Sequence, residues 1–550
     1  MTPPVISQLT ERRSQARRTR ITGGTVIDGT GTSARRADLV IEGDRVTAIT
    51  PQRPSGAPTG TVAGHATAQA SAGDGDDVID ATGRWVVPGF VDVHSHSDHT
   101  LLEDPRAMSA IAQGVTTELV GNCGYGCFPI VDPVTASRAV YGLSRRLPLQ
   151  PADAASYLDR LERRQPAVNV ATLVPHGQVR LSVLGDAQRA ASNAEIDRMV
   201  AQVDDGLAAG AWGLSSGLEY PQERATTLEE MVALCAPVAT VGGLYATHPR
   251  HRGPRSIEAV DEAITTARRA AVRLQISHLL PRVDDETAGC LQAVASARDE
   301  HLDVAFDMHT RTFGFTYLSA LLPANLPLGV NKSRRIDGES SKHVEHAIAA
   351  HLQAHGLMAP ADRIIIDQAP DAHLVGRTLA QLADDHHGSL ASCLAALHAV
   401  AGDDPAAITV RFTTYATSSL VDLFTHPWCV PASDATTLCP DGPLASSRFH
   451  GAYTWAAWYF ATMRRDGRLT DAEIVQRLTS APADRIGLRD RGRLKVGAFA
   501  DVVVLDPAKF APRGTPDDPN QLAVGIDQVV VNGQLVTPAS PRSGRVLRRH

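Results

Sequence analysis

PGFVDVHSHSDH, residues 88–99, joins an apolar run of sequence to a pair of histidines. The β-branched and aromatic residues of 85–93 predict a buried strand, and His94 and His96 lie at its end. Side chains two residues apart on a strand point to the same face, so both imidazoles can converge on one point. Neutral imidazole is the commonest nitrogen ligand for zinc and similar ions. The stretch therefore predicts a metal site at the end of a strand.

Further apolar runs follow the same plan along the chain. Helical stretches, such as 195–210 and 256–271, separate them. Strands that alternate with helices indicate a parallel sheet, and eight such units over about 400 residues fit an α/β fold of the TIM (β/α)8 barrel type with insertions. Besides 85–96, the runs are 116–123, 168–177, 211–217, 243–250, 272–278, 302–309 and 429–435.

The sequences at the two ends of the chain have a different pattern, in which short Val-rich strands are separated by turns that contain Gly, Asp and Asn. We expect them to pair into one small composite β-sandwich domain, with the barrel inserted between them. Residues 51–78 are rich in Ala, Gly, Pro and Thr and predict a flexible surface loop. The expected boundaries are 1–19 for a disordered tail, 20–84 and 488–545 for the β-sandwich, 85–487 for the barrel, and 320–405 for an insertion that forms a lid or subdomain.

The composition is that of an ordinary globular protein, with 550 residues, 43% hydrophobic, 21% charged and a net charge of −7. A net charge of this size and sign does not indicate binding to nucleic acid or to an anionic membrane. No apolar run approaches the roughly 20 residues of a membrane helix. Seven scattered cysteines form no disulfide framework, and the Arg-rich N-terminus lacks an apolar signal segment. We expect a cytoplasmic protein that binds a small molecule, and a homo-oligomer is left open.

Nearly every apolar run ends in a side chain capable of chemistry. A metal site needs three or four donors from different parts of the fold, and thiolate, imidazole and carboxylate together suit zinc. Cys123 is either a small buried core residue or a thiolate ligand, and His176 is either a ligand or a hydrogen-bonded structural imidazole. In chain order the candidates are His94, His96, Cys123, His176, His248, His278 and Asp434.

The chain resembles the amidohydrolase superfamily, and specifically the N-acyl-D-amino-acid deacylase (D-aminoacylase) family. The cysteine of GNCG, Cys123, is the specific marker, because most other amidohydrolases have a carboxylated lysine or a glutamate there. The resemblance covers nearly the whole chain. It rests on PGFVDVHSHSD (88–98), GVTTELVGNCG (114–124), GAWGLSSGLEYP (210–221), YATHPR (245–250), ISH (276–278), HPWCVPASDA (426–435) and GRLKVGAFADVVVLDP (492–507).

The resemblance implies roles for the candidates. Cys123, His248 and His278 would hold one tightly bound Zn²⁺, and His94 and His96 would form with Cys123 a weaker second site. Asp434 would serve as metal ligand and as general base for attack by an activated water. Tyr220 would hydrogen-bond the substrate carbonyl oxygen; the alternative for Tyr220 is a packed surface aromatic.

The chain departs from the family where the free carboxylate of the substrate is held. The family's lysine after the sixth-strand histidine is Leu280 here, and its tyrosine and serine are missing from DMHTRTFGF, residues 307–315. A glutamate that commonly follows the fifth-strand arginine is replaced in HPRHRG, residues 248–253, whereas an arginine after the eighth strand is kept. The residues expected at the substrate are Arg448, Arg311, His309, Arg250, Leu280 and Phe315.

Two interpretations of the substrate follow. Either Arg311 and Arg448 rebuild the anion site and the substrate remains an N-acyl amino acid, or the substrate is a less anionic amide, imide or ester. Arg311 could equally form a surface ion pair. A metal-assisted lyase or decarboxylase on the same scaffold would have less need of a base, and the presence of Asp434 opposes it. A non-catalytic scaffold usually loses metal ligands, and this sequence keeps them all.

Overall fold

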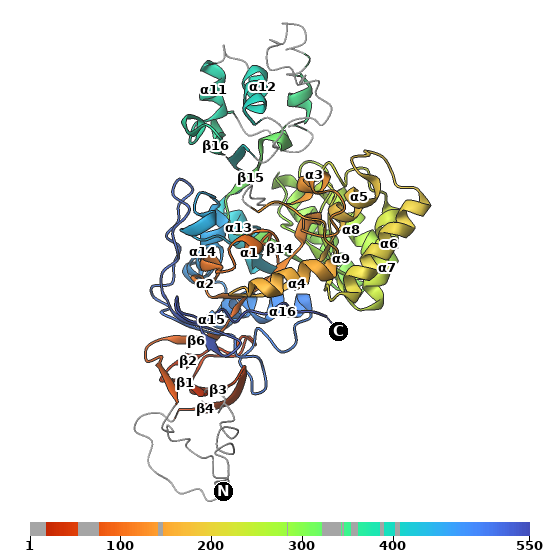
Figure 1. Ribbon diagram of the computed structural model, residues 1–550. Coiled ribbons are helices and arrows are strands. Elements are labelled where there is room, and N and C mark those ends of the chain that lie inside the picture. The colour runs from red at the N-terminus through yellow and green to blue at the C-terminus, as the bar shows by residue number, and fades with distance from the viewer. Residues whose placement is uncertain are drawn as a thin grey trace, which may run out of the picture.

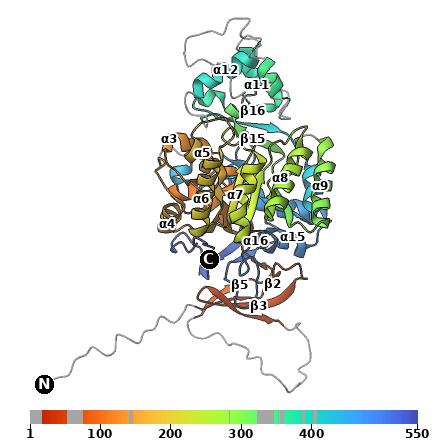
Figure 2. The same ribbon diagram turned by 90° about the vertical axis from the view of Figure 1, so that its right-hand side faces the viewer.

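The computed structural model describes residues 18–52, 76–140, 147–282, 284–321, 343, 346–351, 353, 361–385, 390–401 and 407–549. Their elements form three parts stacked along one direction (Figures 1 and 2). A small part with α11 and α12 lies at one end, and a large helical part occupies the middle. Strands β1–β6 lie at the opposite end, so the large helical part separates them from α11 and α12.

The middle part contains parallel strands in two sheets. One sheet has the order β10-β11-β12-β13-β14-β18 and the other β7-β8-β9. Leu173 alone separates β9 from β10, and a parallel bridge joins Ser95 to Ala435 just beyond β7 and β18. All eight predicted runs contain one of these strands. Their bounds are Phe90–Asp92 (β7), Val115–Val120 (β8), Asn169–Thr172 (β9), Val174–Pro175 (β10), Gly213–Gly217 (β11), Leu244–His248 (β12), Arg273–Ile276 (β13), Val304–His309 (β14) and Cys429–Ala432 (β18).

Helices follow most of these strands, as the alternating pattern predicts. The two expected helices at 195–210 and 256–271 appear as α6 (Asn193–Ala208) and α8 (Ser256–Ala270). Ser192 and Glu195 form a reciprocal capping box at the start of α6. The other helices are α1 (Thr100–Glu103), α2 (Met108–Ile111), α3 (Pro133–Ala136), α4 (Ala154–Arg164), α5 (His176–Leu184), α7 (Leu228–Thr240), α9 (Thr287–Asp299), α13 (Thr417–Thr425), α14 (His450–Asp466), α15 (Asp471–Leu478) and α16 (Ser480–Ile486).

The sequence predicts a single strand over 85–93, and this prediction is wrong. The structure divides the run into β6 (Trp85–Pro88), which pairs with strands of the end sheet, and β7, which pairs with β8. Proline at 88 cannot donate to a ladder, and a Cβ at Gly89 would lie 2.0 Å from Thr116 Oγ1. The chain therefore changes sheets at Pro88–Gly89, three residues later than the expected boundary at 85.

Strands from both ends of the chain share one nine-stranded sheet of order β21-β20-β19-β6-β2-β3-β1-β5, with β4 paired to β3. Arg18 and Thr19, expected in the tail, belong to β1, and residues 1–17 lie outside the described residues. Residues 53–75 of the expected loop also lie outside them, while its ends belong to β4 and β5. The bounds are Arg18–Thr22 (β1), Thr25–Val26 (β2), Arg35–Glu42 (β3), Arg45–Pro51 (β4), Asp77–Asp80 (β5), Val502–Leu505 (β19), Ile526–Val531 (β20) and Gln534–Leu535 (β21).

The region expected as an insertion, 320–405, contains β16, an edge strand of a three-stranded antiparallel sheet of order β15-β17-β16, whose other two strands lie just before and just after that region. The strands of this sheet are β15 (Phe313–Tyr317), β16 (Ile364–Gln368) and β17 (Thr409–Thr413), and α11 (Leu379–Asp385) and α12 (Leu390–Ala401) accompany them. These elements have a hydrophobic cluster of their own, which includes Ile366, Leu394 and Val410. Much of 322–360 lies outside the described residues. Among the described helices, none is long and apolar enough to cross a membrane.

Candidate metal centre

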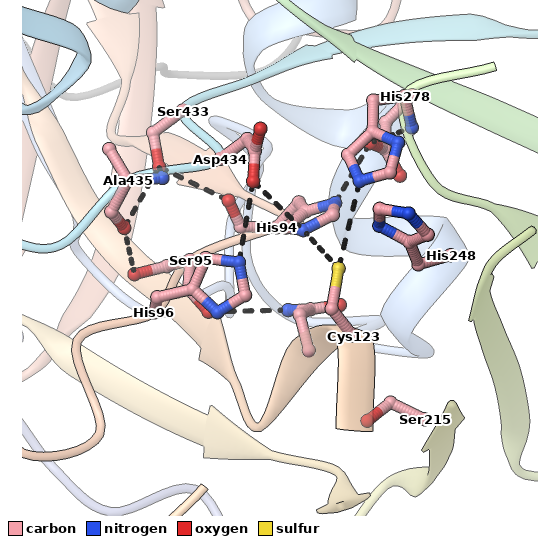
Figure 3. Close-up of polar contacts among 12 residues, drawn as sticks. His94, Ser95, His96, Cys123, Ser215, His248, His278, Ser433, Asp434 and Ala435 are labelled. Carbon is pink, nitrogen blue, oxygen red and sulfur yellow. Dashed lines mark hydrogen bonds and ion pairs between the residues drawn. The ribbon is translucent and has the colours of Figure 1, made fainter. Parts of the chain in front are cut away.

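Three side chains from three different strands meet around the sulfur of Cys123 (Figure 3). Cys123 Sγ lies 3.2 Å from His94 Nε2 and 3.7 Å from His278 Nε2. His94 follows β7, Cys123 follows β8 and His278 follows β13. All three side chains are buried, and one ligand atom of each lies within 4.8 Å of the others. The predicted convergence of distant sequence motifs is thus present in space.

Asp434 joins a second group that shares His94. Its Oδ1 lies 3.3 Å from His96 Nε2 and 3.5 Å from His94 Nε2. The three residues again have ligand atoms within 4.8 Å of one another. The Asp434 side chain keeps 20% of its surface exposed, whereas both imidazoles are buried. The carboxylate therefore forms the solvent-facing side of the cluster.

The backbone at three of these residues adopts a rare conformation. Cys123, His278 and Asp434 have φ values of 54°, 36° and 44°, and they are three of the eight non-glycine residues with positive φ in the described part of the chain. Left-handed backbone is unfavourable for residues with a Cβ and persists only where the surroundings enforce it. The fold thus accepts strain at three of the four strand ends that supply this cluster, as functional sites often do.

Asp307, two residues before the end of β14, supports the cluster from behind. Its Oδ1 lies 3.0 Å from His94 Nδ1 and accepts a hydrogen bond of 3.0 Å from the backbone N–H of His278. A carboxylate on the second nitrogen of a histidine fixes the ring and its tautomer. Sequence reasoning did not assign Asp307 a role, although a carboxylate at the end of a predicted strand was a usable signal.

His248 lies beside the cluster but points its nitrogens at other partners. His248 Nε2 lies 2.8 Å from Glu219 Oε2, and His248 Nδ1 lies 3.2 Å from the Tyr220 hydroxyl. Glu219 in turn accepts from Arg282 Nη1 at 2.7 Å. The His248 and His278 ring centroids are 4.5 Å apart. The network of Glu219 and Arg282 was not expected from sequence, because partners 63 residues apart leave no local pattern.

Burial and charge set the ionisation of these groups. Burial lowers the pKa of His248 to about 4, against the opposing effect of Glu219. Burial and the charge of Arg252 also hold the pKa of His278 well below its usual range, so both imidazoles are neutral near pH 7. Burial would raise the pKa of Asp434, but the hydrogen bond from His96 and the charge of Arg311 keep it well below the ordinary value. A neutral imidazole and an ionised carboxylate are the forms that bind metal.

The residues expected at the substrate lie in different settings. Arg311 Nη2 donates to Asp434 Oδ2 at 2.9 Å, and buried His309 packs its ring 5.6 Å from that of Tyr415. Leu280 is buried in the main hydrophobic cluster, and its carbonyl accepts from Arg252. Phe315 packs edge-on against Phe449 at 4.4 Å.

Two of the expected arginines have partners away from the cluster. Arg448 Nη2 donates to the carbonyl of Asp517. Arg250 pairs with Glu262 at 2.8 Å and donates to the carbonyls of Arg224 and Thr226. The structure thus brings Arg311 and His309 to the cluster and engages Arg448 and Arg250 elsewhere.

His176 lies in a separate, fully buried ionic network. Its Nδ1 is 2.6 Å from Glu223 Oε2 and its Nε2 is 3.0 Å from Glu230 Oε1. Arg180 Nη1 donates to both oxygens of Glu230 at 2.6 Å. Both nitrogens of His176 are therefore engaged, as the structural alternative for this residue predicts.

The donor set suits zinc. One thiol, three imidazoles and one carboxylate lie in two overlapping groups, and the set is nearly closed to solvent. Nitrogen and sulfur donors with a carboxylate are the ligands that zinc prefers. The Nδ1 atom of His278 is buried and has no hydrogen-bond partner among the described residues. These residues in this arrangement fit a zinc ion. The partly exposed carboxylate of Asp434 marks the side of the site that faces solvent.

Comparison with known proteins gives one family. The model described as the amidohydrolase family matches residues 77–537. Among curated relatives, the N-acyl-D-glutamate deacylase of Alcaligenes xylosoxydans xylosoxydans is 32% identical over 542 residues, which is 96% of each chain. The D-aminoacylase of the same organism is 31% identical, over 96% of this chain and 97% of its own.

Solved structures agree with the sequence relatives. The N-acyl-D-glutamate deacylase of Bordetella bronchiseptica, complexed with zinc and a phosphonate mimic of the tetrahedral intermediate, superposes with a TM-score of 0.78 at 28% identity, covering 97% of this chain and 100% of that one. A D-aminoacylase described as having a binuclear metal centre, with one-metal activation and second-metal attenuation, gives 0.77 at 28% identity, over 96% and 99% of the two chains.

Proposed function

The chain belongs to the amidohydrolase family, and from that premise we propose that it is a zinc-dependent hydrolase that cleaves the amide bond of N-acyl-D-amino acids. The observation that carries the proposal is the convergence of His94, Cys123, His278 and Asp434, from four separate strands, within two overlapping groups. Relatives that match over nearly the whole chain act on N-acyl-D-glutamate and other N-acyl-D-amino acids, as their names state.

The ligand roles are part of the proposal. Cys123 and His278 would hold the tightly bound ion together with His248, whose ring lies beside that of His278; His248 would first have to release either the Tyr220 hydroxyl or the Glu219 carboxylate. His94 and His96 would form the weaker site with Cys123, and Asp434, which groups with both histidines, would serve as a further ligand. When bound, zinc lowers the pKa of a water molecule and polarises the amide carbonyl.

The remaining steps belong to side chains of this chain. Asp434 is ionised and partly exposed, so it can accept a proton from the attacking water and pass it to the leaving nitrogen. Tyr220 presents its hydroxyl beside the His248 ring, where it can donate to the developing oxyanion. Asp307 holds His94 and the His278 backbone in place during the reaction.

The substrate-binding set remains a proposal. His309 ends β14, and its Nδ1 accepts from the backbone N–H of Arg311; His309 would face the amino-acid half of the substrate beside Arg311. Arg448 and Arg250 reach the substrate only if they exchange their present partners, and Leu280 and Phe315 would contribute apolar surface. The D-configuration follows from the relatives and is part of the same proposal.

We also infer the finer architecture. The two parallel sheets are the arcs of one closed (β/α)8 barrel, supported by the short gap between β9 and β10 and by the Ser95–Ala435 bridge. An inner cluster that includes Val91, Leu119 and Val430 would fill its interior. The nine-stranded sheet is the composite domain of both chain ends, and β15–β17 with α11 and α12 form the inserted subdomain.

A cytoplasmic location is likewise proposed. Its support is that all seven cysteines are free and buried in the described structure, as suits a reducing compartment. A homo-oligomer is neither required nor opposed by the arrangement of the site.

A hydrolysis screen tests the proposed activity. Zinc-loaded protein is incubated with N-acetyl-D- and N-acetyl-L-amino acids, dipeptides and cyclic imides, and release of the free amine is measured. We expect hydrolysis of N-acetyl-D-amino acids, with little of the L-series. Turnover of imides or neutral amides alone would instead support the alternative in which the anion site has been lost.

A further inference from the structure

Arg311 follows β14, which pairs with β18, and Asp434 follows β18. The guanidinium of Arg311 therefore reaches the carboxylate of Asp434 from the neighbouring strand. Its Nη2 donates to Asp434 Oδ2 at 2.9 Å, and its Nη1 donates to the Ser433 carbonyl at 2.6 Å. One guanidinium therefore binds both the side chain of Asp434 and the peptide that precedes it. The Arg311 side chain is only 3% exposed, so this pair is largely shielded from water and from screening by salt.

The surroundings are shaped to hold the guanidinium in this place. Its carbon lies 5.0 Å from the ring centre of Phe449, within the range of a cation–π contact. Phe315 packs against the same Phe449 ring. A Cβ at Gly451, in the first turn of α14, would lie 2.3 Å from Arg311 Nη1, closer than atoms approach in proteins. The absence of a side chain at Gly451 thus leaves the space that the guanidinium fills.

The two oxygens of Asp434 consequently face different partners. Oδ1 faces His94 and His96, and Oδ2 faces Arg311. Asp434 also has a left-handed backbone, with φ of 44°, so its side chain leaves the chain at an unusual angle. A carboxylate in that position needs a second point of attachment if its plane is to stay fixed.

We propose that Arg311 is a positioning residue, which locks the carboxylate of Asp434 in the orientation that proton transfer requires. The inference rests on the proposed function, in which Asp434 is the general base. Arg311 acts neither as the base nor as a metal ligand. Its guanidinium contacts Oδ2 of Asp434, the oxygen that faces away from the histidines. Proton transfer depends on placement to within a fraction of an ångström, so a loosened carboxylate slows turnover.

This role differs from the binding of the substrate carboxylate. Both terminal nitrogens of Arg311 already have acceptors, and only the buried Nε has no partner among the described residues. A residue that held the substrate would control KM, whereas a residue that positions the base controls kcat. The two roles can therefore be separated by kinetics.

Gly451→Ala gives the sharpest test, because it displaces the guanidinium without removing its charge. Alanine favours a helix by about 1 kcal/mol over glycine, which offsets part of the cost of the close contacts with Arg311 Nη1 and Phe449 Cε1, so we expect the variant to fold. We expect kcat for an N-acetyl-D-amino acid to fall roughly tenfold, with KM, zinc content by mass spectrometry and melting temperature nearly unchanged.

Gly289→Ala is the matched control. Gly289 also lies in a helix, and a Cβ there would meet a flexible side chain, Ile257 Cδ1, at the same 2.3 Å, far from the cluster. We expect wild-type kinetics from this variant. A loss of activity in both alanine variants would point to general strain and would overturn the proposal.

Arg311→Ala with added guanidinium completes the test. We expect kcat to fall roughly 100-fold and to recover in part at millimolar guanidinium, because the free cation can occupy the vacated place. Unchanged kcat in Gly451→Ala, or a rise of KM with kcat unchanged in either variant, would overturn the positioning role; if Arg311→Ala fails to fold, Gly451→Ala decides. Wild-type activity is measured first, and its absence would refute the proposed function rather than this inference.

Discussion

At the residue scale, the cluster depends on a cysteine that touches two histidines. Cys123 Sγ approaches His94 Nε2 and His278 Nε2, and no other described residue joins these two rings in the same way. A thiolate that contacts both imidazoles would make Cys123 important for metal retention.

Replacing Cys123 with alanine should therefore release the metal. We expect the purified variant to hold less than about one tenth of the wild-type zinc, since each lost ligand or supporting residue weakens a site by about 10- to 100-fold. Zinc is measured by inductively coupled plasma mass spectrometry after gel filtration. Cys127→Ala, at a second buried cysteine four residues away, is the control and should keep its zinc. Stoichiometric zinc in Cys123→Ala would rule out its role as a ligand.

Asp434→Asn separates metal binding from proton transfer. The amide keeps the size of the side chain but cannot accept the proton, so we expect kcat to fall by about 10³-fold, within the range of lost general-base catalysis. Zinc content should remain near normal, because the cysteine and histidines are intact. Wild-type turnover in this variant would remove Asp434 from the mechanism.

The sequence predicts the ligands of this centre better than their partners. His94, Cys123 and His278 end apolar runs, and that position alone predicts that they lie together at the carboxyl ends of the parallel strands. The hydrogen-bond acceptors of the arginines cannot be predicted in the same way, because a guanidinium can donate to any carboxylate or carbonyl that the fold brings near. Arg311 was expected at the substrate or in a surface ion pair, and its guanidinium lies against the partly exposed carboxylate of Asp434.

At the element scale, the network of His176 fastens α5 and α7 to the end of β11. Glu223 accepts from the Gly217 backbone N–H at 2.8 Å while it pairs with His176, and Glu230 lies in α7. Burial lowers the pKa of His176, but the charges of and hydrogen bonds with Glu223 and Glu230 outweigh it and raise the pKa. The folded protein thus binds a proton here more tightly than the unfolded chain does.

The stabilisation by His176 should depend on pH. Because the folded pKa is raised, the contribution is fully present below the unfolded value of about 6.5 and is lost as the pH rises through the folded value. We expect His176→Gln to lower the free energy of unfolding of the metal-free protein by about 3 to 5 kcal/mol near pH 6 and by less near pH 9. Urea unfolding followed by circular dichroism measures both, and an equal loss at both pH values would show that the pKa of His176 is not raised in the folded protein.

The positions of the strands could be read from the sequence, but their membership in sheets could not. β-branched runs predict β8, β12 and β14 because buried parallel strands are apolar on both faces. The change of sheet between β6 and β7 depends on contact between Gly89 and Thr116, which lie far apart in sequence. The bounds of the inserted segment depend in the same way on the pairing of β15 with β17.

At the scale of the whole molecule, a buried polar network joins the nine-stranded sheet to β9, one of the parallel strands of the middle part. Asn532 Nδ2 donates to Asn169 Oδ1 at 2.7 Å, and Asn532 Oδ1 accepts from Arg491 at 2.8 Å. The backbone N–H of Asn532 donates to Asp501 Oδ1 at 2.8 Å. Asn169 begins β9, so the two parts of the chain share hydrogen bonds that water cannot replace.

Asn532→Gly should destabilise the whole protein rather than one part. Glycine suits the φ of 48° at this position, so the variant removes the side-chain hydrogen bonds without adding strain. We expect a loss of about 3 kcal/mol in the free energy of unfolding, because Arg491 Nη2 and the carbonyl of Ser543 lose their hydrogen-bond partner. Differential scanning calorimetry should show one transition at a lower temperature, and a separate early transition would mean that the two parts unfold independently.

The central claim is that hydrolysis depends on a metal held by this cluster, and titration of the metal-free protein with zinc tests it most directly. Release of amino acid from an N-acetyl-D-amino acid is measured after each addition. We expect no turnover without metal and a rise to full activity as the first equivalent of zinc binds. Hydrolysis that persists without metal, or none at any zinc level, would contradict the claim.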